Sequence, residues 1–224
     1  MVLYLGLLLA GVRFLRDEEA GSPAGSPDPN LAAVVFQGAV GLVVAAVSLL
    51  ALRRLRKGTA RPGASPWRAA KAGVLYALAF QPVLLAVGFL QSFLREAPRP
   101  QALVSLATEG SVSAFLVVAA FAVLAAPFTE EVFFRGLLYG GLRTWTGRGL
   151  ATLLTAVAFA AVHMEPGNPD ALAPIFLLAL FLCDLRERTE GVIAPIVMHA
   201  CFNGLQMGMI YIMRSGGPGF PAGG

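Results

Sequence analysis

The chain has 224 residues, of which 57% are hydrophobic and only 13% are charged. Soluble domains carry about 25% charged residues, and the apolar residues here stand in long runs, so the composition excludes a soluble enzyme. The net charge of +4 does not favour a nucleic-acid partner. Most of the excess lies in one short loop between two apolar runs, a pattern typical of cytoplasmic membrane loops.

Long apolar runs follow one another along the chain, and a membrane-spanning helix needs about 20 such residues. A shorter apolar stretch, Val2–Val12, comes first and lacks the features of a signal peptide, so we expect a tilted or partial helix there. We therefore predict an all-α fold, a polytopic transmembrane bundle of six to seven helices. The other candidate spans are 31–52, 72–94, 111–128 continuing into 129–142, 149–164, 171–185 and 191–213.

The loops predict an orientation. Residues 53–71 hold seven basic and no acidic residues, so we expect them on the cytoplasmic side. Alternation of the spans then places 143–148 and 186–190 on the same side and 165–170 outside. Arg13 and Arg16 do not fit, because they follow the first stretch at its expected outer end.

Three parts are expected along the chain. Residues 1–104 are predicted to form N-terminal membrane helices with the basic cytoplasmic loop, 105–213 an intramembrane core, and 214–224 a flexible tail. The Ala-, Gly- and Arg-rich composition suits a multi-pass protein of a bacterial inner membrane. Its immediate partners would then be membrane lipids.

Polar residues within the later apolar runs are the informative ones, since a charge at the bilayer centre costs about 2.5–3.5 kcal/mol on insertion scales. Counting about 1.5 Å per residue from the neighbouring charged loops places them in the middle or outer half of the membrane core. Three separate helices would thus bring them to one buried polar pocket. These residues are Glu130, Glu131, Arg135, His163, His199 and Asn203.

Two of these residues predict an ion pair. Glu131 and Arg135 are four residues apart and share one helix face, and pairing would offset much of their desolvation. Glu130 points about 100° away and lacks that partner, which favours a carboxylate that faces a watery cavity. The alternative, a purely structural charge cluster between helices, stays open for Glu131 and Arg135.

His199 and Asn203 also lie four residues apart on one face. Such a pair serves either as a site or as polar contacts that hold two membrane helices together. His163, near the end of an apolar run, is by itself more typical of a satisfied interface residue than of a catalyst. Each of these residues is therefore expected to be functional only if all of them lie together in one pocket.

One carboxylate, two imidazoles and a carboxamide suit the addition of water to a carbonyl group. Glu130 would take a proton from water, and His163 would hold that water and later pass a proton to the leaving amine. His199 and Asn203 would donate hydrogen bonds to the oxyanion. Cys201, two residues after His199, points elsewhere, so no cysteine or serine is an obvious nucleophile.

Zinc is the alternative cofactor for the same residues. Two histidines and a glutamate are a possible ligand set, but no H-E-x-x-H motif is present and the histidines are 36 positions apart. The sequence therefore favours a glutamate mechanism with no cofactor over a zinc-dependent metalloprotease.

Three motifs occur in order over residues 105–213 and together resemble the CAAX-protease and bacteriocin-processing (CPBP, or Abi) family of intramembrane endopeptidases, which includes the type II CAAX prenyl proteases. The motifs are E-E-x-x-x-R at Glu130, Glu131 and Arg135, F-x-x-x-H at Phe159 and His163, and H-x-x-x-N at His199 and Asn203.

The resemblance implies roles for these residues. Glu130 and His163 would activate water, His199 and Asn203 would form the oxyanion hole, and the remaining motif residues, Glu131, Arg135 and Phe159, would support the site.

The implied substrate is a membrane-associated protein or peptide: a prenylated C-terminus, a leader peptide or a C-terminal sorting tail, the last as in the similar myxosortases. A non-catalytic immunity or assembly factor with the same pocket is the alternative. A small transporter is a third possibility, but the expected inverted repeats or broken helices are not evident in the sequence.

Overall fold

The computed structural model describes residues 64–94, 112–164 and 171–215, together with the short pieces 39, 41–43, 46–50 and 107. Apart from short connections these residues are helical, as predicted. Val2–Val12, most of 31–52, residues 53–63, 165–170 and the tail after 215 lie outside the described residues. The longer elements are α3 (Pro66–Leu94), α5 (Val112–Ala120), the π-helix η1 (Phe121–Ala125), α6 (Ala126–Glu131), the π-helix η2 (Val132–Leu138), α7 (Tyr139–Val162), α8 (Leu172–Thr189) and α9 (Ile193–Arg214).

Three described helical runs are long and apolar enough to cross a membrane: Pro66–Gln91, Phe115–Val162 and Ile193–Arg214. This is consistent with an integral membrane protein, although six to seven spans are not seen among the described residues. The predicted span at 171–185 is helical, but α8 is not among the three runs. Its last two turns carry four charged residues, namely Asp184, Arg186, Glu187 and Arg188.

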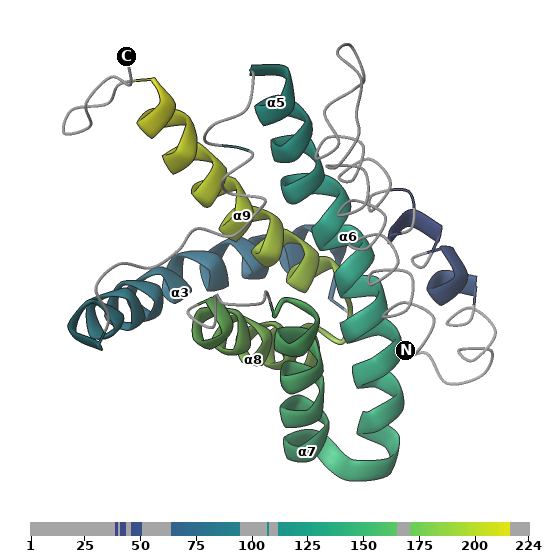
Figure 1. Ribbon diagram of the computed structural model, residues 1–224. Helices are drawn as coiled ribbons and strands as arrows, with labels where there is room; N and C mark the ends of the chain where they lie inside the picture. The colour runs from purple at the N-terminus through teal and green to yellow at the C-terminus, as the bar shows by residue number, and fades with distance from the viewer. Residues whose placement is uncertain are drawn as a thin grey trace, which may run out of the picture.

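The longest run doubles back on itself. Phe115–Val162 contains 48 residues, which at 1.5 Å per residue would extend about 70 Å, more than twice the thickness of a bilayer core. The backbone leaves the helical conformation at Gly147, with φ 78° and ψ 175°, a conformation that glycine adopts readily. Figure 1 shows the chain turning there, so that the part of α7 after Gly147 returns beside η2. The predicted break between 129–142 and 149–164 lies at this bend.

Two π-helical stretches flank the short helix α6, which contains both glutamates of the first motif. Pro127 lies at the start of α6 and has no backbone N–H to continue a regular α-helical ladder. Such π-helical insertions are frequent at functional sites.

Helices α3 and α9 pack against each other most closely at Gly73. A Cβ atom at this position would lie 2.6 Å from the carbonyl oxygen of Ala194 and 2.8 Å from Cβ of Val197. The absence of a side chain therefore lets the two backbones approach. The contact fixes the first turns of α9, which lead to His199.

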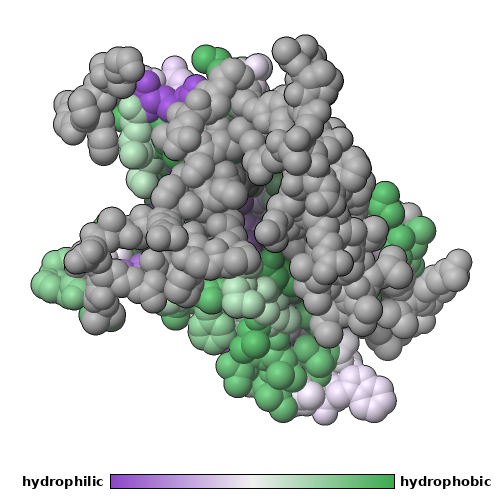
Figure 2. Space-filling model, viewed as in Figure 1, coloured by the Kyte–Doolittle hydropathy of each residue, from purple (hydrophilic) through white to green (hydrophobic). Residues whose placement is uncertain are grey.

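The exterior of the described helices is largely apolar. Figure 2 shows hydrophobic residues over the lower part of the face in view, where Figure 1 places α7. A soluble protein would cover such surfaces with polar groups, whereas lipid does not require them. Exposed examples on three helices are Leu78, Leu85, Phe89, Phe93, Leu153, Val157, Met209 and Ile212.

The three loops predicted to be cytoplasmic meet at one end of the molecule. The backbone N–H of Ala64 donates to the carbonyl of Thr189 at 3.2 Å, and Arg143 Nε lies 2.9 Å from Glu187 Oε1. The grouping of these loops on one side is therefore confirmed for the described residues. Which compartment that side faces stays a prediction.

Candidate active site

Glu131 and Arg135 form the buried ion pair predicted from their spacing. Arg135 Nη1 donates to Glu131 Oε1 at 2.9 Å, and both side chains are 0% exposed. Arg135 Nη2 also donates to the carbonyl of Ala179 on α8 at 3.3 Å. The pair therefore connects η2 and α6 to α8 rather than closing only its own helical turn.

His199 of α9 joins this pair. Its Nδ1 lies 2.9 Å from Glu131 Oε1, and the residue is only 4% exposed. Since Oε1 of Glu131 also accepts the hydrogen bond from Arg135, this oxygen is an acceptor and His199 Nδ1 is the donor. Glu131 thus orients His199, and Nε2 of the imidazole is left for contacts within the site.

Phe159 lies on α7, and its ring covers the ion pair of Glu131 and Arg135. Arg135 Cζ lies 4.4 Å from its centroid, a cation–π distance. The ring centroids of His163 and His199 lie 4.6 Å and 5.9 Å from the same phenyl ring. Phe159 thus contacts both histidines as well as Arg135, and its supporting role stays a prediction.

Glu130 and His163 face each other across a gap. His163 Nε2 lies 3.7 Å from Glu130 Oε2, beyond the length of a good hydrogen bond. That oxygen is buried and receives no hydrogen bond from the described residues. The side chains are 15% and 28% exposed for Glu130 and His163, so this pair is more open than Glu131 and Arg135.

The backbone determines which nitrogen of His163 faces Glu130. Nδ1 lies 2.7 Å from the carbonyl oxygen of Phe159, and since a carbonyl only accepts, Nδ1 must donate. In the neutral imidazole, Nε2 then presents its lone pair to Glu130. Two acceptors 3.7 Å apart match the two hydrogens of one water molecule placed about 2.8 Å from each.

Asn203, one turn after His199, makes a contact that the sequence did not suggest. Its Nδ2 donates to the carbonyl of Ala122 in η1 at 2.7 Å. One of the two amide hydrogens is thereby used, and the second remains for the site. Asn203 thus holds α9 to η1 in addition to lying on the same helix face as His199.

The structure brings the sequence-predicted residues together in two linked pairs, Glu131 with His199 and Glu130 with His163, around Phe159. Sequence reasoning missed the carbonyls of Ala179 and Ala122, because backbone acceptors have no side-chain signature. For Ala122 a signal exists in Pro127, five residues later, which removes a backbone donor. Pairings with main-chain atoms of other helices are otherwise a matter of packing.

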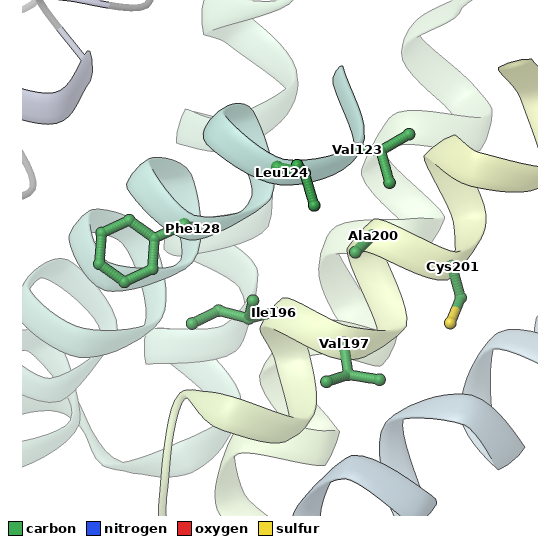
Figure 3. A pocket seen from close by; sticks show the side chains of 7 residues that line it. All are labelled: Val123, Leu124, Phe128, Ile196, Val197, Ala200 and Cys201. Carbon is green, nitrogen blue, oxygen red and sulfur yellow. The ribbon is translucent and has the colours of Figure 1, made fainter. Parts of the chain in front are cut away.

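An apolar groove lies between η1, α6 and α9, next to the helices that hold the site. The groove has a volume of about 510 Å³. Figure 3 shows the side chains that line it, which come from η1 and α6 on one side and from α9 on the other. Cys201 is one of them, so this thiol lies on the groove side of α9 rather than beside Glu131. The lining residues are Val123, Leu124, Phe128, Ile196, Val197, Ala200 and Cys201.

A zinc site needs at least three protein ligands close together. Within the part of the chain that the structure describes, no three side chains of His, Cys, Asp or Glu are grouped as a metal site would require. His199 Nδ1 is already bonded to Glu131. The two histidines and Glu130 thus do not form the three-ligand set weighed from the sequence.

With this geometry in place, comparison with known proteins identifies the central part of the chain. Residues 112–205 match the family model described as type II CAAX prenyl endopeptidase, Rce1-like. These residues are therefore similar to an Rce1-like domain. The match extends over all seven motif residues and confirms the resemblance to the CPBP family.

A second comparison finds a bacterial relative. The chain is 35% identical over 77 residues to an uncharacterized 24.3 kDa protein of Escherichia coli. The match covers 33% of this chain and 35% of the relative, so the chain spans about a third of the length of the relative it matches. No solved structure matches the chain.

Proposed function

We propose that this protein is an intramembrane endopeptidase that hydrolyses a peptide bond of a membrane-associated protein or peptide by water activated between Glu130 and His163. The observation on which this rests is the 3.7 Å gap between Glu130 Oε2 and His163 Nε2. Both atoms are acceptors directed at the same space. The Rce1-like domain match supports a protein or peptide substrate.

The first step is deprotonation of the bridging water. Glu130 accepts one proton while His163 Nε2 accepts a hydrogen bond from the other, and the resulting hydroxide adds to the scissile carbonyl carbon. General-base assistance of this kind contributes about 10²–10⁴-fold. Oε2 of Glu130 is buried and receives no hydrogen bond from the described residues, so it is available to accept this proton.

The second requirement is stabilisation of the tetrahedral oxyanion. His199 Nδ1 is occupied by Glu131, so Nε2 donates to an oxyanion only when the imidazole is protonated. The Glu131 carboxylate, 2.9 Å away, stabilises that imidazolium. The second amide hydrogen of Asn203 is the other donor, and each donor is worth about 2.7–4 kcal/mol in comparable sites.

The last step breaks the carbon–nitrogen bond. The proton taken from water passes from the Glu130–His163 pair to the leaving nitrogen, so that an amine and a carboxylic acid are released and both groups return to their starting state. Phe159 holds the two imidazoles apart, which keeps the proton-transfer pair separate from the oxyanion donors.

The location proposed for this reaction is a bacterial inner membrane. The clustering of the predicted cytoplasmic loops at one end supports a multi-pass protein, and the Escherichia coli relative is in keeping with a bacterial source. We infer six to seven spans in all, with residues 105–213 as the catalytic core that follows an N-terminal membrane region. No nucleic-acid partner is proposed.

The test is cleavage by the purified full-length protein in detergent, with products identified by mass spectrometry. Three probe sets cover the substrate classes: peptides that end in an S-farnesylated cysteine motif, leader peptides, and peptides with a transmembrane helix and basic tail. We expect cleavage of one set, reduced about 10²–10⁴-fold by Glu130→Gln or His163→Ala. Glu190→Gln, an exposed carboxylate outside the site, is the matched control.

The other outcomes are equally definite. Activity that is lost with a chelator and restored by zinc would replace the proposal with a metalloprotease. Cleavage that persists in Glu130→Gln would contradict the water-activating role of this carboxylate. The third outcome is that no probe set is cleaved and that cells carrying Glu130→Gln behave like cells with the wild-type protein. In that case the protein is an immunity or assembly factor.

A further inference from the structure

The bond between Asn203 and Ala122 joins two segments 81 residues apart in the chain. Asn203 Nδ2 lies 2.7 Å from the carbonyl oxygen of Ala122, and Ala122 is buried, with 6% of its surface exposed. A short contact from an amide to a buried carbonyl raises the question of why this carbonyl is free to accept it.

The sequence of η1 and α6 explains the free carbonyl. In the π-helical ladder the N–H of Ala126 donates to the carbonyl of Phe121, five residues earlier. The next rung would join the carbonyl of Ala122 to the N–H of residue 127. Residue 127 is proline, which has no N–H, so this rung cannot form within the chain segment.

A carbonyl left without a partner in this setting is costly. Buried backbone acceptors are almost always satisfied, and an unsatisfied one costs the full desolvation of the group. Water is scarce among apolar helices, so a side-chain donor from another helix is the available replacement. Asn203 supplies that donor from α9.

We propose that Asn203 is a positioning residue: its amide replaces the hydrogen bond that Pro127 removes, and this bond holds α9 against η1 so that His199 faces Glu131. His199 lies one turn before Asn203 on the same face of α9. The bond therefore fixes both the rotation and the height of α9 at the point where its imidazole enters the site. This role adds to the oxyanion contact of the second amide hydrogen, and only its activity readout rests on the proposed function.

The test is a double-mutant cycle between positions 203 and 127 in the purified full-length protein. Asn203→Ala should lower the melting temperature by roughly 3–8 °C, because the carbonyl of Ala122 loses its donor. In a Pro127→Ala background an N–H is available at position 127, so the same substitution should cost less than half as much. Pro82→Ala, which removes a proline inside α3, is the matched control and should leave the cost of Asn203→Ala unchanged.

Activity supplies a readout that a merely structural contact would not move. Asn203→Ala should reduce kcat at least about tenfold and displace the pH profile, because an α9 that rotates takes His199 from Glu131. Adding Pro127→Ala should recover part of kcat and restore the pH profile. A residue that acts only as an oxyanion donor would show no recovery.

Equal costs of Asn203→Ala in the wild-type and Pro127→Ala backgrounds overturn the proposal. Where Pro127→Ala does not fold, Asn203→Gln, which keeps an NH₂ donor, is compared with Asn203→Leu, which has none. A Leu variant as stable as the Gln variant also overturns it. Thermal coupling without any peptidase activity would support the positioning bond while contradicting the proposed function, so the two failures are distinguishable.

Discussion

The two adjacent glutamates of α6 have opposite environments. Glu131 is 0% exposed and is bonded to Arg135 and His199. Glu130 is partly exposed, and Nε2 of His163 lies 3.7 Å from its Oε2. Consecutive helix positions point about 100° apart, so one carboxylate turns toward the packed core and the other toward an open gap.

This difference distinguishes Glu131, which holds the site together, from Glu130, which we propose reacts in it. Oε1 of Glu131 accepts hydrogen bonds from both Arg135 and His199, so this oxygen is held in place within the packed core. A carboxylate that faces a second acceptor across a gap accommodates a water molecule. The comparison of Glu130 with Glu131 can be tested by variants that affect only one of the two.

The largest effect on stability is expected from Glu131→Gln. Removing one partner of a buried ion pair leaves Arg135 without its counter-charge and costs about 3–5 kcal/mol, a drop of roughly 10 °C or more in melting temperature. Thermal unfolding followed by circular dichroism in detergent measures the drop.

The isosteric variant at the neighbouring position, Glu130→Gln, is the control. It should lower the free energy of unfolding by less than about 1 kcal/mol, because Glu130 makes no ion pair at hydrogen-bonding distance with the described residues. Combining Glu131→Leu with Arg135→Leu should recover much of the stability, because no buried charge remains unpaired. Equal losses for the two glutamine variants would show that Glu130 is as much a structural residue as Glu131.

A smaller effect on stability is expected from Gly73→Ala, which disturbs the packing of α9 against α3. The added Cβ would lie 2.6 Å from the carbonyl oxygen of Ala194, so α9 must move, at a cost of about 1–3 kcal/mol. Since His199 lies on α9 whereas Glu130 and His163 do not, the contact with Glu131 should weaken first. Unfolding and the pH dependence of cleavage measure the two consequences.

Gly88→Ala on the same helix is the matched control, because a Cβ there meets nothing within 4 Å. It should be neutral or slightly stabilising, since alanine favours a helix more than glycine does. If both alanine variants behave alike, the close approach at Gly73 does not position α9.

The smallest effect concerns the charged end of the molecule. Burial raises the pKa of Glu187, but hydrogen bonds from Tyr139 and Arg143 and the charge of Arg143 outweigh it, so the pKa is lowered. A lowered folded-state pKa stabilises the fold above the ordinary glutamate range, and this contribution is lost as pH falls through that range to the folded-state pKa.

The melting temperature of the wild type should therefore decrease in acid more than that of Glu187→Gln, by about 1–3 °C. Glu190→Gln, three residues later and exposed, should keep the wild-type acid dependence. If Glu190→Gln loses the acid dependence and Glu187→Gln keeps it, the dependence does not come from Glu187.

Much of the fold was predictable because apolar length and charged loops alone determine where helices can cross a bilayer. The pairing of Glu131 with Arg135 was predictable too, since helical geometry brings positions four apart together. The number of spans was not, because α8 combines an apolar start with a charged end that only its packing accommodates.

By itself the sequence determined that the chain is helical and apolar, that three motifs lie at spacings typical of one peptidase family, and that the two glutamates point in different directions. Tertiary structure alone decided which histidine meets which glutamate, that Phe159 contacts both imidazoles, and that Asn203 satisfies the carbonyl of Ala122. The physical reason is range: helical periodicity relates neighbours within a few residues, whereas these contacts join segments 33 to 81 residues apart, whose relative rotation depends on packing at positions such as Gly73 and Pro127.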